Sequence, residues 1–320
     1  MRRVLLRTGI RLGELAVVLV VLSAVVFGLL YLAPGDPART LVGAKQATPE
    51  LLAAIRERYA LDQPLWEQYL RWVGAALQGD FGSSIRTNLP VTEVIAGRFG
   101  VTLELVLLAA VVAVIVGVPA GVVAARRFGS GTDRVITGTA VAGVSAPSFA
   151  VGLVLLYVFA VRLGWFPVYG LGDGGWLDRL HHLALPVLTL ALGVIATLIK
   201  VTRAAMIKEV DADYGAFARS RGIGEGQITV AQVRNASVPI VTSTGLVLAS
   251  LIGGTILVET VFALGGLGGL LSEAVTFKDI PVVQAITLGM AAFICSVSAL
   301  VDVAVGLVDP RVRLRRAAIR

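Results

Sequence analysis

The residues best suited to chemistry are acidic side chains placed in strongly apolar stretches. Four carboxylates lie within or at the edges of such stretches: Glu14, Glu104, Glu259 and Asp302. A charge at the centre of a bilayer costs about 2.5–3.5 kcal/mol on insertion scales, so each is expected to face a bundle interior or an interface. Glu104 and Glu259, with Ser145, are candidates for a polar lining of a solute path, and a structural pairing is equally open. For Glu14 and Asp302, near the ends of their stretches, the structural pairing is favoured.

Motifs that mark common enzymes and nucleotide sites are absent from the sequence. There is no GxxxxGK[ST] phosphate loop, and no HExxH, GxSxG or CxxC. His181 and His182 are adjacent and so do not share a helix face, and Cys295 is the single cysteine. The sequence therefore predicts no catalytic residue, no metal ligand and no cofactor bound by this chain.

A short basic segment, DADYGAFARSRGIGEGQ, lies at residues 211–227 and separates two long apolar stretches. Asp211 or Asp213 is expected to cap a short helix, and Gly222 is expected to end it. Small, aromatic and basic side chains could together face another protein; they are Tyr214, Gly215, Ala216, Phe217, Ala218, Arg219 and Arg221. From the residues alone, a protein-docking element and a basic loop resting on the membrane surface are equally open.

The composition places these residues in a membrane. Hydrophobic residues make up 56% of the 320, charged residues only 15%, and the mean hydropathy is +0.84. The net charge of +7 does not indicate nucleic-acid binding, because the basic residues flank apolar stretches rather than forming a polar face. We expect an all-α polytopic membrane protein with about six transmembrane helices, at 12–33, 101–125, 135–162, 183–206, 238–263 and 282–308.

Most of the 28 lysines and arginines lie on one side of this arrangement, so we expect both termini in the cytoplasm. The resulting organisation has six parts: a cytoplasmic N-terminus at 1–11, transmembrane helix 1 at 12–33, an extracytoplasmic segment at 34–98, a five-helix core at 99–308, a cytoplasmic loop at 207–237 within that core, and a basic tail at 309–320. In the segment 34–98, Thr48 is a plausible N-cap and Pro49 a first helical residue. This segment could be a helical cap or a docking surface for a partner that brings substrate.

The stretch EVDADYGAFARSRG at 209–222, followed by Arg234-Asn235 and Pro239, resembles the cytoplasmic loop of ABC-importer permeases. The resemblance is to the dipeptide/oligopeptide/nickel transport family, and it runs through most of the chain in order. The strings that carry it are LAPGDPA, LDQPLWEQYLRWVGAALQGDFGSS, SAPSF, LGWFP, LALPVLTLAL, VETVFALGGLGGLL and DPRVR. The long outer segment is similar to that of the first permease of the pair. Ser220 and Arg221 replace the usual Ala and Lys, Gln232 replaces a basic residue, and ALGGLGG lacks the family's Trp-Pro.

The resemblance implies a transport subunit of a bacterial cytoplasmic membrane rather than an enzyme. Its partners would be a second permease, two ATP-binding subunits that use ATP and Mg²⁺, and an extracytoplasmic solute-binding protein. Residues 211–222 would form a coupling helix, and the residues implied in coupling are Glu209, Asp213, Tyr214, Ala218, Arg219, Arg221 and Gly222.

The family implies short peptides as cargo, with nickel or another metal chelate as an alternative. Three methionines, one cysteine and two adjacent histidines give a metal path little support. A proton-coupled secondary transporter that uses Glu104, Glu259 or Asp302 is the alternative from another class.

Overall fold

The structure is a computed structural model of the chain and describes residues 2–32, 36–42, 48–59 and 61–308. Within these residues the chain forms helices joined by turns, with one isolated β-bridge between Ser83 and Pro90. The expectation of an all-α polytopic membrane protein is confirmed. The basic tail at 309–320 lies outside the described residues. The chain divides into two compact units: unit 1 contains residues up to 102 and 265–295, and unit 2 contains 103–264 and the residues from 296 onward.

Three helices are long and apolar enough to cross a membrane: α5 (Val91–Arg126), α8 (Trp176–Val210) and α13 (Ile280–Val308). Helix α1 (Arg2–Leu32) runs unbroken for 31 residues, or about 46 Å at 1.5 Å per residue. This length exceeds the hydrocarbon thickness of about 30 Å. The expected boundary at residue 12, between N-terminus and span, is therefore not a break in the helix.

The third expected span, 135–162, is not one straight helix. It consists of α6 (Gly131–Ser145), α7 (Ser148–Leu155) and the π-helix η1 (Leu156–Arg162), and the two arms meet at 102°. Ala146 at the bend is extended, with φ −87° and ψ 128°, because a residue before proline is disfavoured in the helical region. Helix α11 (Ser237–Val261) also bends, by 40° between Gly245 and Ala249. Counting each bent pair once gives up to five spans by length and composition, beside the shorter apolar part of α1, Gly13–Gly28.

The expected extracytoplasmic segment contains α2 (Pro37–Val42), α3 (Pro49–Tyr59) and α4 (Leu65–Leu77). The Thr48 hydroxyl accepts a hydrogen bond from the Leu51 N–H at 3.3 Å, and Pro49 opens α3, as the sequence predicted. Pro64 stands at the N-cap of α4 and separates it from α3. The stretch VTEVIAGRFG, residues 91–100, forms the first turns of α5.

In unit 1, the core joins the start of α5 to α12 (Leu267–Thr276) and the start of α13. Val91, Leu270 and Ile286 are buried in this core. Asp279, 3% exposed, accepts hydrogen bonds from the Ser84 hydroxyl and from the Ile85 N–H, which ties residues nearly two hundred positions apart. Because the Asp279 carboxylate is buried and hydrogen-bonded, it holds this part of unit 1 in place.

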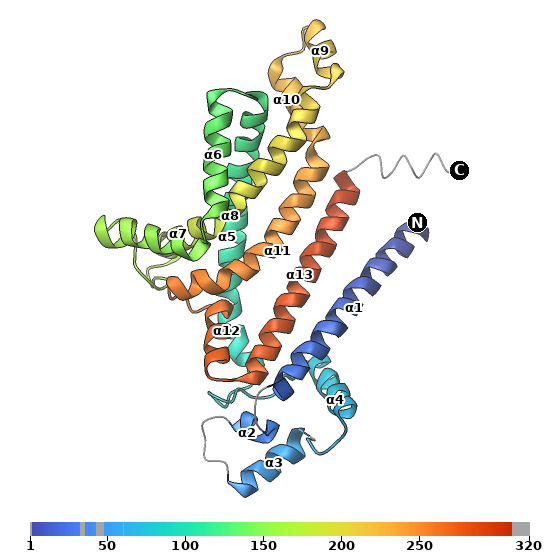
Figure 1. The fold of residues 1–320 in the computed structure, drawn as a ribbon, viewed down its shortest axis with the longest axis vertical. Coiled ribbons are helices and arrows are strands. Elements are labelled where there is room, and N and C mark those ends of the chain that lie inside the picture. Colours follow the sequence, from blue (N-terminus) through green and yellow to red (C-terminus); the bar gives the residue numbers. More distant parts are fainter. Residues whose placement is uncertain (1, 33–35, 43–47, 60, 309–320) are drawn as a thin grey trace. The chain divides into compact units, whose positions relative to one another are not determined.

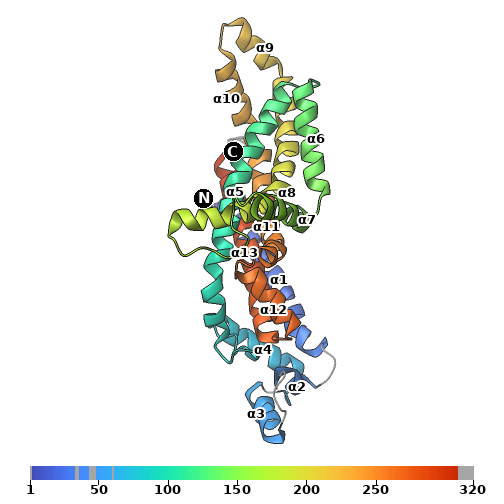
Figure 2. The ribbon, with the colours of Figure 1, turned by 90° about the vertical axis from the view of Figure 1, so that its left-hand side faces the viewer.

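In unit 2, α8 is the central helix and packs against α6, α7 and α11 (Figures 1 and 2). Gly117 and Gly121 of α5 bring its backbone close to α8. A Cβ added at Gly121 would lie 2.6 Å from the Thr202 Cβ and 2.9 Å from the Ile199 carbonyl oxygen. This spacing of small residues is the one that allows membrane helices to approach closely. Two short helices, α9 (Asp213–Ser220) and α10 (Glu225–Asn235), form one end of the unit (Figure 1).

Candidate functional site

The candidate site is the segment that joins α8 to α10 through α9. The Asp211 N–H donates to the Ile207 carbonyl and closes α8, so Asp211 caps the end of α8 and not the start of α9. The N-cap of α9 is Ala212, and no side chain caps this end. The expectation that Asp211 or Asp213 caps the short helix is therefore wrong. Asp213 is instead the exposed first residue of α9, where its charge favours the positive end of the helix dipole.

The expectation that Gly222 ends the short helix is confirmed. Gly222 has φ +75°, its N–H donates to the Arg219 carbonyl at 2.9 Å, and the Ile223 N–H donates to the Ala218 carbonyl at 3.1 Å. This pair of bonds is a Schellman motif, which satisfies carbonyls that a helix end otherwise leaves unpaired. A side chain with a Cβ is strained at this φ, so glycine is needed here for the backbone path.

Polar contacts attach α9 to the end of α8. The Tyr214 hydroxyl donates to the Glu209 carboxylate at 2.8 Å, and Gln232 Nε2 of α10 donates to the Glu209 carbonyl at 3.3 Å. Gln232 is 3% exposed, so the residue that replaces a basic side chain of the family has become a buried link between two helices. Burial, helped by the nearby Glu209 carboxylate, raises the pKa of Tyr214, so the phenol keeps the proton that it donates.

Glu225 at the start of α10 connects three helices. Its carboxylate lies 3.0 Å from Arg126 Nη2 at the end of α5 and 3.4 Å from Arg219 Nη1 in α9. Sequence reasoning missed Glu225 and Arg126, because they are 99 positions apart and only the fold brings them together. The one local signal was the position of Glu225 just after Gly224. This position indicates the start of a helix, and it does not indicate an ion pair with two other helices.

Exposed apolar side chains lie on α9 and in the turn that follows it. Phe217 is 63% exposed, Ile223 is 41% exposed and Tyr214 is 36% exposed. The Arg221 guanidinium lies 5.3 Å from the centre of the Phe217 ring. Polar contacts to Glu209 and Glu225 therefore hold a short helix that carries exposed aromatic and basic side chains.

The start of α6 is held to α8 by Asp133 and Arg203, two residues that the sequence did not indicate as site residues. The two oxygens of Asp133 lie 2.6 and 2.7 Å from Nε and Nη2 of Arg203, a bidentate pair. Asp133 also accepts from the Gly129 N–H and the Thr137 hydroxyl, and it is 3% exposed. This pairing fixes α8 to the first turn of α6 and, through the Gly129 N–H, to the turn before it.

The candidate path residues have different surroundings. The Glu104 carboxylate lies 2.6 Å from Arg179 Nε of α8, so its charge is balanced within unit 2. The Ser145 hydroxyl donates to the Val141 carbonyl at 2.9 Å, one residue before the bend at Ala146. Glu259 in α11 is 1% exposed. The side chain of Asp302 lies outside the part of the chain that the structure describes.

The two histidines have separate partners. The rings of His181 and His182 bond to the carbonyls of Trp165 and Asp178, at 2.8 and 2.9 Å. Within the described residues, no group of three His, Cys, Asp or Glu side chains could hold a metal ion.

Two family profiles together account for nearly the whole chain. Residues 117–314 match the binding-protein-dependent transport system inner membrane component, and residues 1–106 match the N-terminal part of the membrane component of such systems. The chain belongs to this family. The family's ABC-transporter permeases carry no ATPase of their own, so the chain is a multi-pass transport subunit rather than an enzyme, and separate subunits hydrolyse ATP.

Individual relatives agree with this assignment. The chain is 38% identical over 306 residues to the glutathione transport system permease protein GsiC of Escherichia coli strain K12, and equally to that of Shigella dysenteriae strain Sd197. Each match covers 95% of this chain and 98% of the relative. An inward-facing structure of the MetNI methionine ABC transporter, in its CY5 native crystal form, is similar with a TM-score of 0.54 and 16% identity, over 68% of this chain and 96% of that one. The latter likeness shows the permease fold.

Proposed function

We propose that this permease forms one half of the translocation path of an ATP-driven importer for short peptides. The observation that carries the proposal is the match to glutathione transport permeases over 98% of their length, since glutathione is itself a tripeptide. Its partners are a second permease chain, two ATP-binding subunits and an extracytoplasmic solute-binding protein. Much of the cargo selectivity belongs to that binding protein, and the permease supplies a path that accepts peptides.

Both termini lie in the cytoplasm in this proposal, and α9 and α10 face the ATPase subunits. Basic residues at this end of unit 2 support the orientation by the positive-inside rule; they are Arg126, Arg127, Lys208, Arg219, Arg221 and Arg234. The segment 34–98 is then extracytoplasmic, on the side from which the binding protein delivers cargo.

Helix α9 acts as the coupling helix. Phe217 and Tyr214 seat it in a groove on one ATPase, with Ala218 and Arg219 on the same short helix and Arg221 at its C-cap. When ATP closes the ATPase dimer, α9 is displaced, and its bonds to Glu209 and Glu225 carry the displacement to α8 and α5. Transport is then a population shift in which ATP and the loaded binding protein each favour one state.

The cargo is tested by uptake into proteoliposomes that contain the complete four-subunit complex and its binding protein. We expect ATP-dependent uptake of labelled glutathione and of labelled dipeptides, each reduced by excess unlabelled peptide. A nickel chelate should neither be taken up nor compete. Uptake of nickel without competition from peptides would replace the peptide proposal with the metal-chelate alternative.

A further inference from the structure

Helix α4 lies against the apolar part of α1. The Tyr69 hydroxyl is 2.7 Å from the Ser23 hydroxyl, and the rings of Tyr69 and Trp72 lie 5.6 and 5.8 Å from the ring of Phe27. Ser23 and Phe27 both fall within the apolar stretch Gly13–Gly28 of α1. In a chain that spans a membrane, α4 therefore packs beside a part of α1 that lies at membrane depth rather than beyond it.

The opposite face of α4 is also apolar. Trp66, Leu70 and Leu77 are 62%, 59% and 84% exposed, and their spacing of four and seven residues places them on one side of the helix. On α1, Val17, Val21 and Val25 are likewise more than half exposed. A helix with apolar side chains on two faces and an exposed tryptophan, packed near the end of a spanning helix, has the character of a helix at the edge of the hydrocarbon region.

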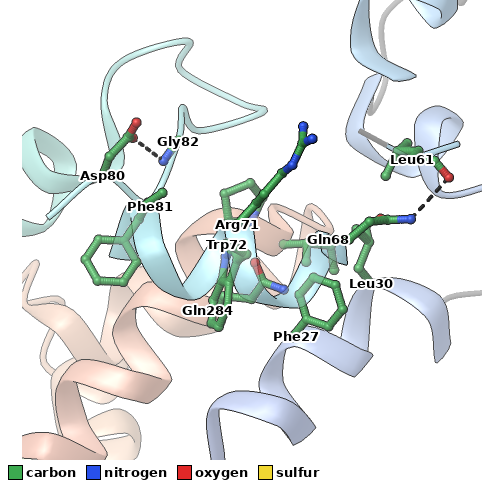
Figure 3. A pocket seen from close by; sticks show the side chains of 13 residues that line it. Phe27, Leu30, Leu61, Gln68, Arg71, Trp72, Asp80, Phe81, Gly82 and Gln284 are labelled. Atoms are coloured by element: carbon green, nitrogen blue, oxygen red, sulfur yellow. Dashed lines mark hydrogen bonds between the residues drawn. The ribbon is translucent and has the colours of Figure 1, made fainter. Parts of the chain in front are cut away.

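A cavity of about 220 Å³ lies between α4, α1 and the start of α13, all within unit 1 (Figure 3). Its walls are mainly apolar: Phe27, Leu30, Trp72, Ala75, Phe81, Ile280 and Pro281. The buried amide nitrogens at its edge are already used, since Gln68 Nε2 donates to the carbonyls of Leu61 and Gln63, and Gln284 Nε2 donates to that of Val26. The interior of the cavity therefore suits an apolar group.

Arg71 gives the same cavity a charged rim. Its side chain is exposed, it makes no ion pair with any residue that the structure describes, and its guanidinium extends away from the rings of Phe27 and Phe81 (Figure 3). Asp80 lies on the rim too, where one carboxylate oxygen accepts the Gly82 N–H at 2.8 Å. The cavity thus combines apolar walls with one cation and one carboxylate at its edge.

We propose that this cavity is a phospholipid site. One acyl chain packs against Phe27, Trp72 and Phe81, and the phosphate pairs with the Arg71 guanidinium, which forms strong charge-assisted bonds to phosphate oxygens. A headgroup with an ammonium beside its phosphate matches Arg71 and Asp80 together better than a headgroup with a phosphate alone. The lipid comes from the leaflet that the C-terminal half of α1 occupies. This inference requires that the chain spans a membrane, and it does not depend on the proposed cargo.

The test is native mass spectrometry of the complex, extracted in a mild detergent and titrated with phosphatidylethanolamine or phosphatidylglycerol. Arg71→Ala removes the phosphate partner, and Ala75→Phe fills the cavity without changing charge. Arg39→Ala is the matched control, since it removes one exposed arginine from the same segment but outside the cavity. We expect a retained lipid on the wild type and the control, with phosphatidylethanolamine preferred, and about tenfold weaker binding in both cavity variants.

A second measurement locates the lipid. A phosphatidylethanolamine with a photoreactive group on its acyl chain, placed in vesicles with the wild-type complex, should label peptides from α1 and α4 that contain Phe27 and Trp72. Equal lipid retention by the wild type, Arg71→Ala and Ala75→Phe would overturn the proposal, as would labelling confined to other helices. Peptide uptake is scored in the same preparations, so a failed lipid site and a failed cargo assignment remain distinguishable.

Discussion

Two regions of this permease expose apolar side chains, but they are built differently. At the α9 end of unit 2, Phe217 projects from a short helix that is held by polar contacts to Glu209 and Glu225, the first of them made by the Tyr214 hydroxyl. At the α4 end of unit 1, Trp66 and Leu70 project from a helix whose inner side is fixed by aromatic packing on Phe27. At α9, polar contacts and nearby basic side chains suit the binding of a protein partner that transmits force. At α4, aromatic packing beside an apolar span suits contact with lipid.

The largest expected difference comes from placing a charge on each exposed face. Phe217→Asp should abolish co-purification of the ATPase subunits, because a carboxylate replaces the aromatic anchor of α9. Leu70→Asp, the matched change on α4, should leave the ATPase bound and instead lower the thermal stability of the complex in lipid nanodiscs. Quantitative mass spectrometry and nanodisc melting distinguish the two. Loss of the ATPase from Leu70→Asp would break the comparison.

Gly222→Val should lower ATP-dependent uptake by about tenfold, because a β-branched residue is strained at φ +75° and misdirects α9. Gly224→Val is the control: Gly224 has φ −66° and ψ 145°, which valine adopts freely. Membrane insertion, measured by the amount of folded complex, should be the same in both variants. Normal uptake by Gly222→Val would remove the basis for the coupling role of this turn.

Glu225→Gln tests whether α9 is attached firmly enough to transmit force. The change keeps the size of the side chain but removes the charge that joins Arg126 to Arg219, so we expect uptake to fall about fivefold with ATP hydrolysis largely kept. The ratio of peptide imported to ATP hydrolysed is the measurement. Glu57→Gln serves as the control, since Glu57 is an exposed residue of α3, away from α9, and makes no ion pair with any residue that the structure describes. An unchanged ratio would show that the bridge is not needed.

Tyr214→Phe should have the smallest effect. It removes one hydrogen bond to Glu209 and keeps the ring, so a reduction in uptake of about threefold or less is expected. Tyr214→Ala, which also removes the ring, should reduce uptake further by weakening ATPase binding. Equal uptake by the two variants would mean that the ring contributes nothing to docking.

Local chemistry predicted the features that depend on a few neighbouring residues. Thr48 and Pro49 identified the start of α3, and Gly222 identified the end of α9, because capping preferences act within a few positions. The same reasoning failed at Asp211, since α8 extends far enough to use that residue as its own last cap. Asp211 lies between the end of α8 and the start of α9, and a capping preference does not indicate which of these two helix ends the residue will cap.

Features that depend on distant residues were missed. The ion pairs of Glu225 with Arg126 and of Asp133 with Arg203 join positions 99 and 70 residues apart, and neither pair has a local pattern. The 102° bend was missed because the apolar stretch 135–162 reads as one span, and membrane helices often tolerate a proline. The bend arises because the backbone of Ala146, the residue before Pro147, is extended and ends α6.

The central claim is that α9 links this permease to an ATP-driven motor. The most direct measurement is uptake of labelled glutathione by proteoliposomes that contain the complete complex and binding protein, with ATP maintained inside and a protonophore added. The account predicts that uptake continues with the protonophore present and stops when ATP is withheld or Phe217→Asp is used. Uptake that stops with the protonophore while ATP is maintained, or that proceeds with this chain alone, would contradict it.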